Sequence, residues 1–265
     1  MPIKKEVSKF LNSLKTPNKL IPYLKKKIRK KLYFTEEKFL EDFFNKKEKK
    51  YIIQIGGNDG IQNDPLRKYF VKKNNYKAII FEPLNYYFEC LVKLYEGRDD
   101  IKIKKTGISN FNGIKELYFI KPAVADQMNG DGPMNNWAHG QGSFDKKTIE
   151  FYIENNQFRG EKYKKDIRFY KESIESEEIK IIKLSDIYIP NNIETLLVID
   201  VQGFELEVIE SINFNNAPKY IFYEDEVKFT KLQKDSLKAE KIKSILKKNN
   251  YKYIGGDHDL IYKKM

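Results

Sequence analysis

A group of small and polar residues, Gly56-Gly57-Asn58-Asp59-Gly60, directly follows a short apolar run, Tyr51 to Ile55. Glycine lets the backbone turn tightly and approach a ligand closely, and a following helix offers free N–H groups. The next apolar run, Ala78 to Phe81, ends at Glu82-Pro83. In a Rossmann-like sheet, a carboxylate at this place accepts hydrogen bonds from ribose hydroxyl groups. The glycine turn and the acid together predict a site for an adenosine-containing ligand.

The spacing of the glycines discriminates among such ligands. The sequence contains neither the G-x-G-x-x-G pattern that binds a dinucleotide pyrophosphate nor the G-x-x-x-x-G-K-[ST] loop that cradles nucleotide phosphates. A compact Gly-Gly-x-x-Gly turn suits a ligand without phosphate groups. S-adenosylmethionine is such a ligand, and we expect it to be the cofactor.

Two acidic residues that follow later apolar runs are candidate catalytic residues. Asp200 follows Leu196 to Ile199, and Glu224 follows Tyr220 to Tyr223. Open α/β sheets bind ligands at the carboxyl ends of their strands, so both carboxylates are expected to face one cleft. Such a pair could hold a divalent cation. Carboxylate clusters are often only solvated, however, and we assign no metal.

The chain has only two histidines, and histidine is the commonest general base in enzymes. His139 lies in a segment with glycines and the only tryptophan, which is typical of a loop that covers a substrate. It is a candidate base, and an idle histidine in a surface loop is the alternative. His258 lies between Asp257 and Asp259, where turn chemistry alone would explain it. The predicted substrate contacts are Trp137, Gln141, Ser143, Gln202 and His258.

Apolar runs that alternate with helical patterns predict the elements that hold these residues. The helix that begins near Asn85 is expected to bury Phe88, Leu91, Val92 and Tyr95. The alternation implies an α/β fold, with a mostly parallel seven-stranded sheet, helices on both faces and an antiparallel C-terminal edge. Strands are predicted at 51–55, 78–81, 101–103, 179–184, 196–199, 220–223, 251–254 and 260–262, with an extra strand at 114–120.

The chain is predicted to form one main domain with two additions. Residues 1–49 are expected to be a helical accessory segment, and residues 50–265 the α/β domain. An insertion at about 121–178 interrupts the alternation and is expected to cover the substrate. The basic amphipathic stretch from Leu20 to Leu32 could touch a membrane or phosphate groups, but a helix that flanks the core is the preferred interpretation.

Composition limits the partners and the compartment. The chain has 265 residues, of which 40% are hydrophobic, and it contains no apolar run of about 20 residues that could span a bilayer. Cys90 is the only cysteine, so an internal disulfide is impossible. These features favour the cytoplasm. The net charge of +12 is spread along the chain, which indicates a solvated surface and no nucleic-acid partner.

Beyond these patterns, the sequence resembles the FkbM-type methyltransferases over about residues 51–212. Its most specific similarity is the block from Val198 to Glu205. The matching segments, in the family's order, are Gln54-Ile55-Gly56-Gly57-Asn58-Asp59-Gly60, Phe81-Glu82-Pro83, Lys105-Thr106-Gly107-Ile108-Ser109 with Gly113, Leu184-Ser185-Asp186-Ile187, and Val198-Ile199-Asp200-Val201-Gln202-Gly203-Phe204-Glu205.

The resemblance implies a Rossmann-like class I methyltransferase fold and a set of cofactor contacts. Gln54 stands where such proteins usually carry an acid, and Val198 stands where a lysine is common. The insertion is also longer than the family leads us to expect. The implied contacts are Gly56, Gly57, Asn58, Asp59 and Gly60 with the amino acid part of the cofactor, Glu82 and Pro83 with the ribose, and Gly107, Ile108 and Ser109 near the adenine, with Gln54 beside them.

The family transfers methyl groups from S-adenosylmethionine to hydroxyl groups of small compounds, including sugars. The sequence therefore leads us to expect an O-methyltransferase that acts on a sugar hydroxyl, in the synthesis of a surface polysaccharide or of its activated, nucleotide-linked sugar. The alternatives are a methyltransferase for a lipid or natural product, and a non-catalytic adenosyl-binding or RNA-binding protein. The sequence leaves the oligomeric state open.

Overall fold

A seven-stranded sheet forms the centre of the computed structural model, which describes residues 35–71, 75–126, 128, 138–156, 166–225, 233–256 and 259–265. The strand order is β10-β11-β9-β8-β1-β2-β3. All neighbours from β3 to β9 are parallel, whereas β11 is antiparallel to both β9 and β10. The predicted Rossmann-like α/β sheet with an antiparallel C-terminal edge is thus confirmed. The strands are β1 (Lys50–Ile55), β2 (Tyr76–Phe81), β3 (Ile101–Lys104), β8 (Glu194–Ile199), β9 (Tyr220–Glu224), β10 (Tyr251–Gly255) and β11 (Asp259–Lys264).

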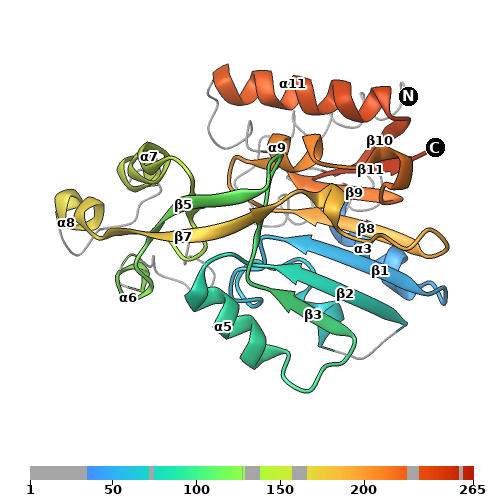
Figure 1. Ribbon diagram of the computed structural model, residues 1–265, viewed down its shortest axis with the longest axis horizontal. Coiled ribbons are helices and arrows are strands. Elements are labelled where there is room, and N and C mark those ends of the chain that lie inside the picture. The colour runs from blue at the N-terminus through green and yellow to red at the C-terminus, as the bar shows by residue number, and fades with distance from the viewer. Residues whose placement is uncertain are drawn as a thin grey trace, which may run out of the picture.

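Helices cover both faces of this sheet, because alternate strand residues point to opposite sides. On one face, Ile53 and Leu197 pack with the helices α9 (Glu205–Glu210) and α11 (Gln233–Lys248). On the other face, Ile52 packs with α3 (Glu36–Asn45), α4 (Arg67–Phe70) and α5 (Asn85–Leu94). Figure 1 shows α11 and α5 on opposite sides of the strands. In the described part of the chain, no helix has both the length and the apolar character needed to cross a bilayer.

The helix α3 belongs to the packed core of the sheet. Thr35 caps it, since its hydroxyl accepts a hydrogen bond from the backbone N–H of Lys38. Phe39, Phe43 and two neighbours on the buried side of α3 pack against the strands and against the helices α4 and α5 on that face of the sheet. The accessory segment expected at residues 1–49 stays a prediction, because residues 1–34 lie outside the described part of the chain. The basic stretch from Leu20 to Leu32 lies outside the described residues.

A second sheet, of order β4-β7-β5-β6, extends away from the central one. β5 and β7 form a long antiparallel ribbon, from Gly113 opposite Ile181 to Ile120 opposite Ile174. Its far end carries α6, α7 and α8 (Figure 1), and we call residues 113–182 the lobe. The prediction that 179–184 resumes the parallel alternation is wrong, because these residues end β7 and continue into a short helical turn. The elements are β4 (Gly107–Ile108), β5 (Gly113–Ile120), α6 (Pro122–Ala125), β6 (Gly142–Ser143), α7 (Lys146–Asn156), α8 (Ile167–Glu172) and β7 (Ile174–Ile182).

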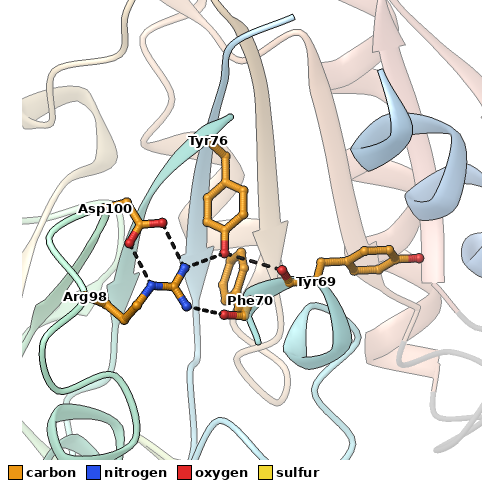
Figure 2. Close-up of polar contacts among 5 residues, drawn as sticks. All are labelled: Tyr69, Phe70, Tyr76, Arg98 and Asp100. Carbon is orange, nitrogen blue, oxygen red and sulfur yellow. Dashed lines mark hydrogen bonds and ion pairs between the residues drawn. The ribbon is translucent and has the colours of Figure 1, made fainter. Parts of the chain in front are cut away.

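A polar clamp fixes the edge of the central sheet at which β2 and β3 begin (Figure 2). The Arg98 guanidinium donates two hydrogen bonds of 2.8 Å to the Asp100 carboxylate, and it also donates to the carbonyl of Phe70 and to the Tyr76 hydroxyl. The Tyr76 hydroxyl in turn donates to the carbonyl of Tyr69. A planar guanidinium can serve several acceptors at once. The clamp therefore ties α4 to β2 and β3, at the edge opposite the carboxyl ends of the strands.

Candidate active site

A cleft lies at the carboxyl ends of β1, β2 and β8. This position is where open α/β sheets bind ligands. Seven of the predicted residues line it, namely Gly56, Glu82, Pro83, Gly107, Ile108, Asp200 and Gln202. The other lining residues are Ile55, Phe81, Leu84, Tyr87, Thr106, Leu117, Gly140, Gly142, Phe144, Val201 and Phe204.

Gly56 brings the ends of three strands together. Its backbone is left-handed, with φ of +83°, and a Cβ atom here would lie 1.7 Å from the carbonyl oxygen of Asp200. Its N–H donates to the carbonyl of Phe81, while the N–H of Asp200 donates to the carbonyl of Ile55. Only glycine fits this position, because the ends of β1 and β8 touch backbone to backbone.

Glu82 is a buried acid that binds the glycine turn. One carboxylate oxygen accepts from the N–H of Asn58 at 2.9 Å, and the other accepts from the N–H of Leu84 at 3.0 Å. Burial raises the pKa of Glu82 to about 7, although its backbone hydrogen bonds oppose the shift. This acid is therefore held rigidly in the cleft and titrates near neutral pH.

Gln202 connects the two predicted catalytic acids. Its side-chain amide donates to Asp200 at 2.7 Å and to Glu224 at 3.2 Å, and its oxygen accepts from the amide of Gln141 at 3.0 Å. The Asp200 side chain opens onto the cleft, but the surrounding protein raises its pKa, while hydrogen bonds with Gln202 and Glu224 oppose the shift. Two carboxyl groups this close titrate as a pair. Among the described residues, no group of three or more His, Cys, Asp or Glu side chains is arranged to hold a metal ion.

His139 is buried, and it lies behind the residues that line the cleft. Its Nδ1 is 3.3 Å from the hydroxyl of Tyr87, and its Nε2 is 2.9 Å from the carboxylate of Asp126. Tyr87 itself lines the cleft. Sequence reasoning missed Tyr87, because it placed Phe88 and Val92 with the buried Leu91 and Tyr95 on the core-facing side of α5. Tyr87 is buried, whereas Val92 is 42% exposed; the spacing of four residues from Tyr87 to Leu91 and Tyr95 was the signal.

Several predicted cofactor residues lie near the cleft without lining it. Gly57 and Gly60 pack against Leu91 of α5, where a Cβ atom would lie within 2.8 Å of its side chain. The Asp59 carboxylate accepts from two backbone N–H groups of its own turn. Gln54 is buried in β1 and hydrogen-bonds Asp64.

The remaining predicted residues lie farther along the chain. Ser109 is buried and its N–H donates to the carbonyl of Ile182. The hydroxyl of Ser143 accepts from the N–H of Asp145 at 3.2 Å. Trp137 and His258 lie outside the described residues.

The cleft also has an aromatic wall that the sequence did not reveal. Phe144 and Phe204 contact each other edge to face, with ring centroids 4.7 Å apart. The ammonium of Lys115 lies 4.5 Å from the centroid of Phe144. Phe204 belongs to the block that resembles the FkbM-type enzymes, whereas Phe144 is contributed by the lobe. This wall offers an apolar surface to a flat group in the cleft.

The fold and the cleft define a Rossmann-like domain with its ligand site at the carboxyl ends of the strands. The chain belongs to the family of the methyltransferase FkbM domain, whose model matches residues 54–253. The family match reaches about 40 residues beyond the segment in which the sequence motifs were recognised.

Two solved structures are similar to this chain. Methyltransferase FkbM from Methylobacillus flagellatus KT is 12% identical, with a TM-score of 0.44, over 82% of this chain and 43% of that protein. This chain thus spans less than half the length of that relative. A putative rRNA-methylase from Clostridium thermocellum is 8% identical, with a TM-score of 0.40, over 88% of this chain and 98% of that one. No curated protein matches the sequence.

Proposed function

We propose that this protein is an O-methyltransferase that uses S-adenosylmethionine and acts on a sugar hydroxyl. The observation that carries the cofactor is the pair of acids in the cleft, Glu82 and Asp200, both with raised pKa values. Carboxylates in such surroundings favour a cationic ligand and disfavour a phosphate. S-adenosylmethionine carries a sulfonium and an ammonium group and has no phosphate, so the residues present fit it.

The proposed contacts follow from where each residue lies. Glu82 would accept hydrogen bonds from the ribose hydroxyls, and Pro83 would pack beside them. Gly56, held against the end of β8, would let the backbone approach the amino acid part. Gly107 and Ile108 would lie near the adenine. The remaining predicted residues, Gln54, Gly57, Asn58, Asp59, Gly60 and Ser109, would shape the turns that hold these contacts.

When bound, the cofactor supplies an electrophilic methyl group, and the protein has to align the acceptor oxygen and receive its proton. Alignment can contribute much of the rate, and a base is needed because a sugar hydroxyl is not ionised at neutral pH. Asp200 opens onto the cleft and is bridged to Glu224, so this pair would orient the acceptor. His139 is proposed to act from behind the cleft wall.

A sugar is the acceptor that the polar lining supports best. The linked amides of Gln141 and Gln202 present fixed donors and acceptors, as recognition of several hydroxyl groups requires. Phe144 adds an apolar surface beside them. Ser143, Trp137 and His258 are further candidate contacts. The basic protein, with a net charge of +12, suits an acceptor that is linked to a nucleotide or belongs to an anionic surface polysaccharide. We place the enzyme in the cytoplasm, where activated sugars are made, and the proposal involves no nucleic acid and no metal.

Calorimetry tests the cofactor. The protein should bind S-adenosylmethionine and should not bind ATP or NAD. Glu82→Ala should weaken binding about 10- to 100-fold, because a charge-assisted hydrogen bond is lost. Glu96 is an exposed acid that also follows β2 in the sequence but lies outside the cleft. Glu96→Ala is therefore the matched control and should bind S-adenosylmethionine normally. Binding of ATP at this cleft, or no binding of S-adenosylmethionine, would refute the proposal.

Mass spectrometry tests the acceptor. Purified protein and S-adenosylmethionine are incubated with a panel of nucleotide sugars, free sugars, fatty acids and phenols. The gain of one methyl group on a sugar supports the proposal. Methylation confined to the fatty acids or phenols would contradict the sugar and leave the cofactor assignment standing.

A further inference from the structure

Tyr87 lies at the junction of two cavities. It lines the cleft described above and also a wider groove of about 620 Å³ between α5 and the β5–β7 ribbon. Leu84, at the start of the same helix, is the other residue common to both. A methyl donor in the cleft and an acceptor in the groove would both lie against Tyr87. The side chain is therefore placed where donor and acceptor would meet.

The hydroxyl of Tyr87 is the first member of a hydrogen-bonded chain that leads out of the cleft. It accepts from the N–H of Gly140 at 3.1 Å and lies 3.3 Å from Nδ1 of His139. Nε2 of His139 lies 2.9 Å from the carboxylate of Asp126. The His139 side chain is 5% exposed, whereas that of Asp126 is 65% exposed. The chain thus connects a buried hydroxyl with solvent.

The direction of the hydrogen bonds follows from the partners. Asp126 is an acceptor when ionised, so Nε2 of His139 carries a proton and Nδ1 is left as an acceptor. The N–H of Gly140 already occupies one lone pair of the Tyr87 oxygen, so its own proton points to Nδ1. One lone pair of that oxygen remains, and it can accept a proton from a substrate hydroxyl.

We propose that Tyr87 is a catalytic residue that receives the proton of the acceptor hydroxyl, and that His139 and Asp126 position it and accept the proton that it gives up. This inference rests on the function proposed above. As the new C–O bond forms and the C–S bond breaks with its electron pair on sulfur, the acceptor proton moves to the Tyr87 oxygen. The original Tyr87 proton moves to Nδ1 of His139. The positive charge lost from the sulfonium appears on the imidazole, beside Asp126, and the proton leaves to water there.

Burial explains why the relay needs both residues. It raises the pKa of Tyr87 well above the ordinary value. A free tyrosinate is therefore not available as a base near neutral pH. Tyr87 can take a proton only while it passes its own to His139. The relay also explains how His139 could take part in catalysis from its position behind the cleft wall.

The first test is the tautomer of His139, which requires no acceptor. The chain has two histidines, so ¹⁵N spectra of the imidazole groups can be assigned with a His258→Asn variant. We expect His139 to carry its proton on Nε2 and to accept a hydrogen bond at Nδ1, and Tyr87→Phe to abolish the hydrogen-bond signature at Nδ1. A proton on Nδ1 in the neutral form would overturn the proposal, because Tyr87 could not then donate to it.

The second test is single-turnover methyl transfer to the sugar accepted in the panel, or to methyl glucoside if several react. Tyr87→Phe should slow transfer about 100-fold or more, while calorimetry shows unchanged affinity for S-adenosylmethionine. His139→Gln should also slow transfer, because Tyr87 then has no imidazole to receive its proton. Asp126→Asn should slow transfer less, because it changes only the last residue of the relay.

Tyr95→Phe is the matched control, since Tyr95 is also buried, at the C-terminal end of α5, but lines neither cavity. It should transfer at the normal rate. Normal transfer by Tyr87→Phe would overturn the relay and leave the proposed function intact. Absence of cofactor binding in the unmodified protein would instead count against the proposed function.

Discussion

Glu82 illustrates how a single residue links folding to binding. Its pKa of about 7 means that it is half protonated near neutral pH. In the proposed complex, only the ionised form would accept from both ribose hydroxyls. Binding at lower pH must therefore release a proton. We expect the affinity for S-adenosylmethionine to fall by up to about tenfold per pH unit below pH 7 and to level off above it. Calorimetry on either side of pH 7 measures this dependence.

The control for this prediction is Glu82→Gln, which has the same shape and no titration. It should bind more weakly than the unmodified protein at high pH, with an affinity that no longer depends on pH. A pH dependence that survives in Glu82→Gln would show that another group, such as Asp200, releases the proton.

Gly56 sets a steric limit on the cleft. Gly56→Ala would require a left-handed alanine and would place Cβ 1.7 Å from the carbonyl oxygen of Asp200. Gly97 also has a positive φ, of +75°, but a Cβ there meets nothing within 4 Å. We expect Gly97→Ala to cost about 1 kcal/mol of stability and Gly56→Ala to cost about 3 kcal/mol or more, as measured by urea unfolding. Equal costs would show that the β1–β8 contact relaxes freely.

At the scale of elements, the clamp around Arg98 should matter for stability and leave binding unchanged. Arg98→Met removes the guanidinium that donates to the buried Asp100 carboxylate and to the carbonyl of Phe70, at a cost of about 2–4 kcal/mol. Arg98→Lys, which keeps the charge but loses the planar fork, should lie between. Because the clamp is at the edge opposite the cleft, cofactor affinity should not change. Urea unfolding measures the loss of stability, and calorimetry measures the cofactor affinity. A fall in affinity would contradict the prediction that the clamp affects stability alone.

The elements differ in how clearly the sequence encodes them. The strands of the central sheet are short apolar runs that end at a glycine or an acid, so they and the acids that follow them could be predicted. In the lobe, β5 could be predicted as the strand at 114–120. The outer half of β7 could not, because it alternates little and carries Glu175, Glu177 and Glu178 on exposed or half-buried positions. The contact of His139 with Tyr87 joins residues 52 positions apart, and no local pattern predicts it.

At the scale of the whole molecule, the chain buries separate apolar clusters. Two lie on the faces of the central sheet, and a third lies in the lobe, around Ile149, Ile153 and Tyr170. We expect Ile153→Ala to increase hydrogen exchange in the lobe while strands β1 and β8 keep their protection. Leu246→Ala, in the cluster under α11, should instead expose the central sheet to exchange. Uniform exchange in both variants would show a single cooperative unit.

The ribbon of β5 and β7 has a consequence for how the proposed activity could diversify. The lobe has its own apolar cluster, yet it contributes Phe144 and Gly140 to the wall of the cleft. We expect substitutions in this separate cluster to change the wall of the cleft while the parallel strands keep their packing. Under the proposed function, relatives could then differ in the acceptor and share one methyl donor.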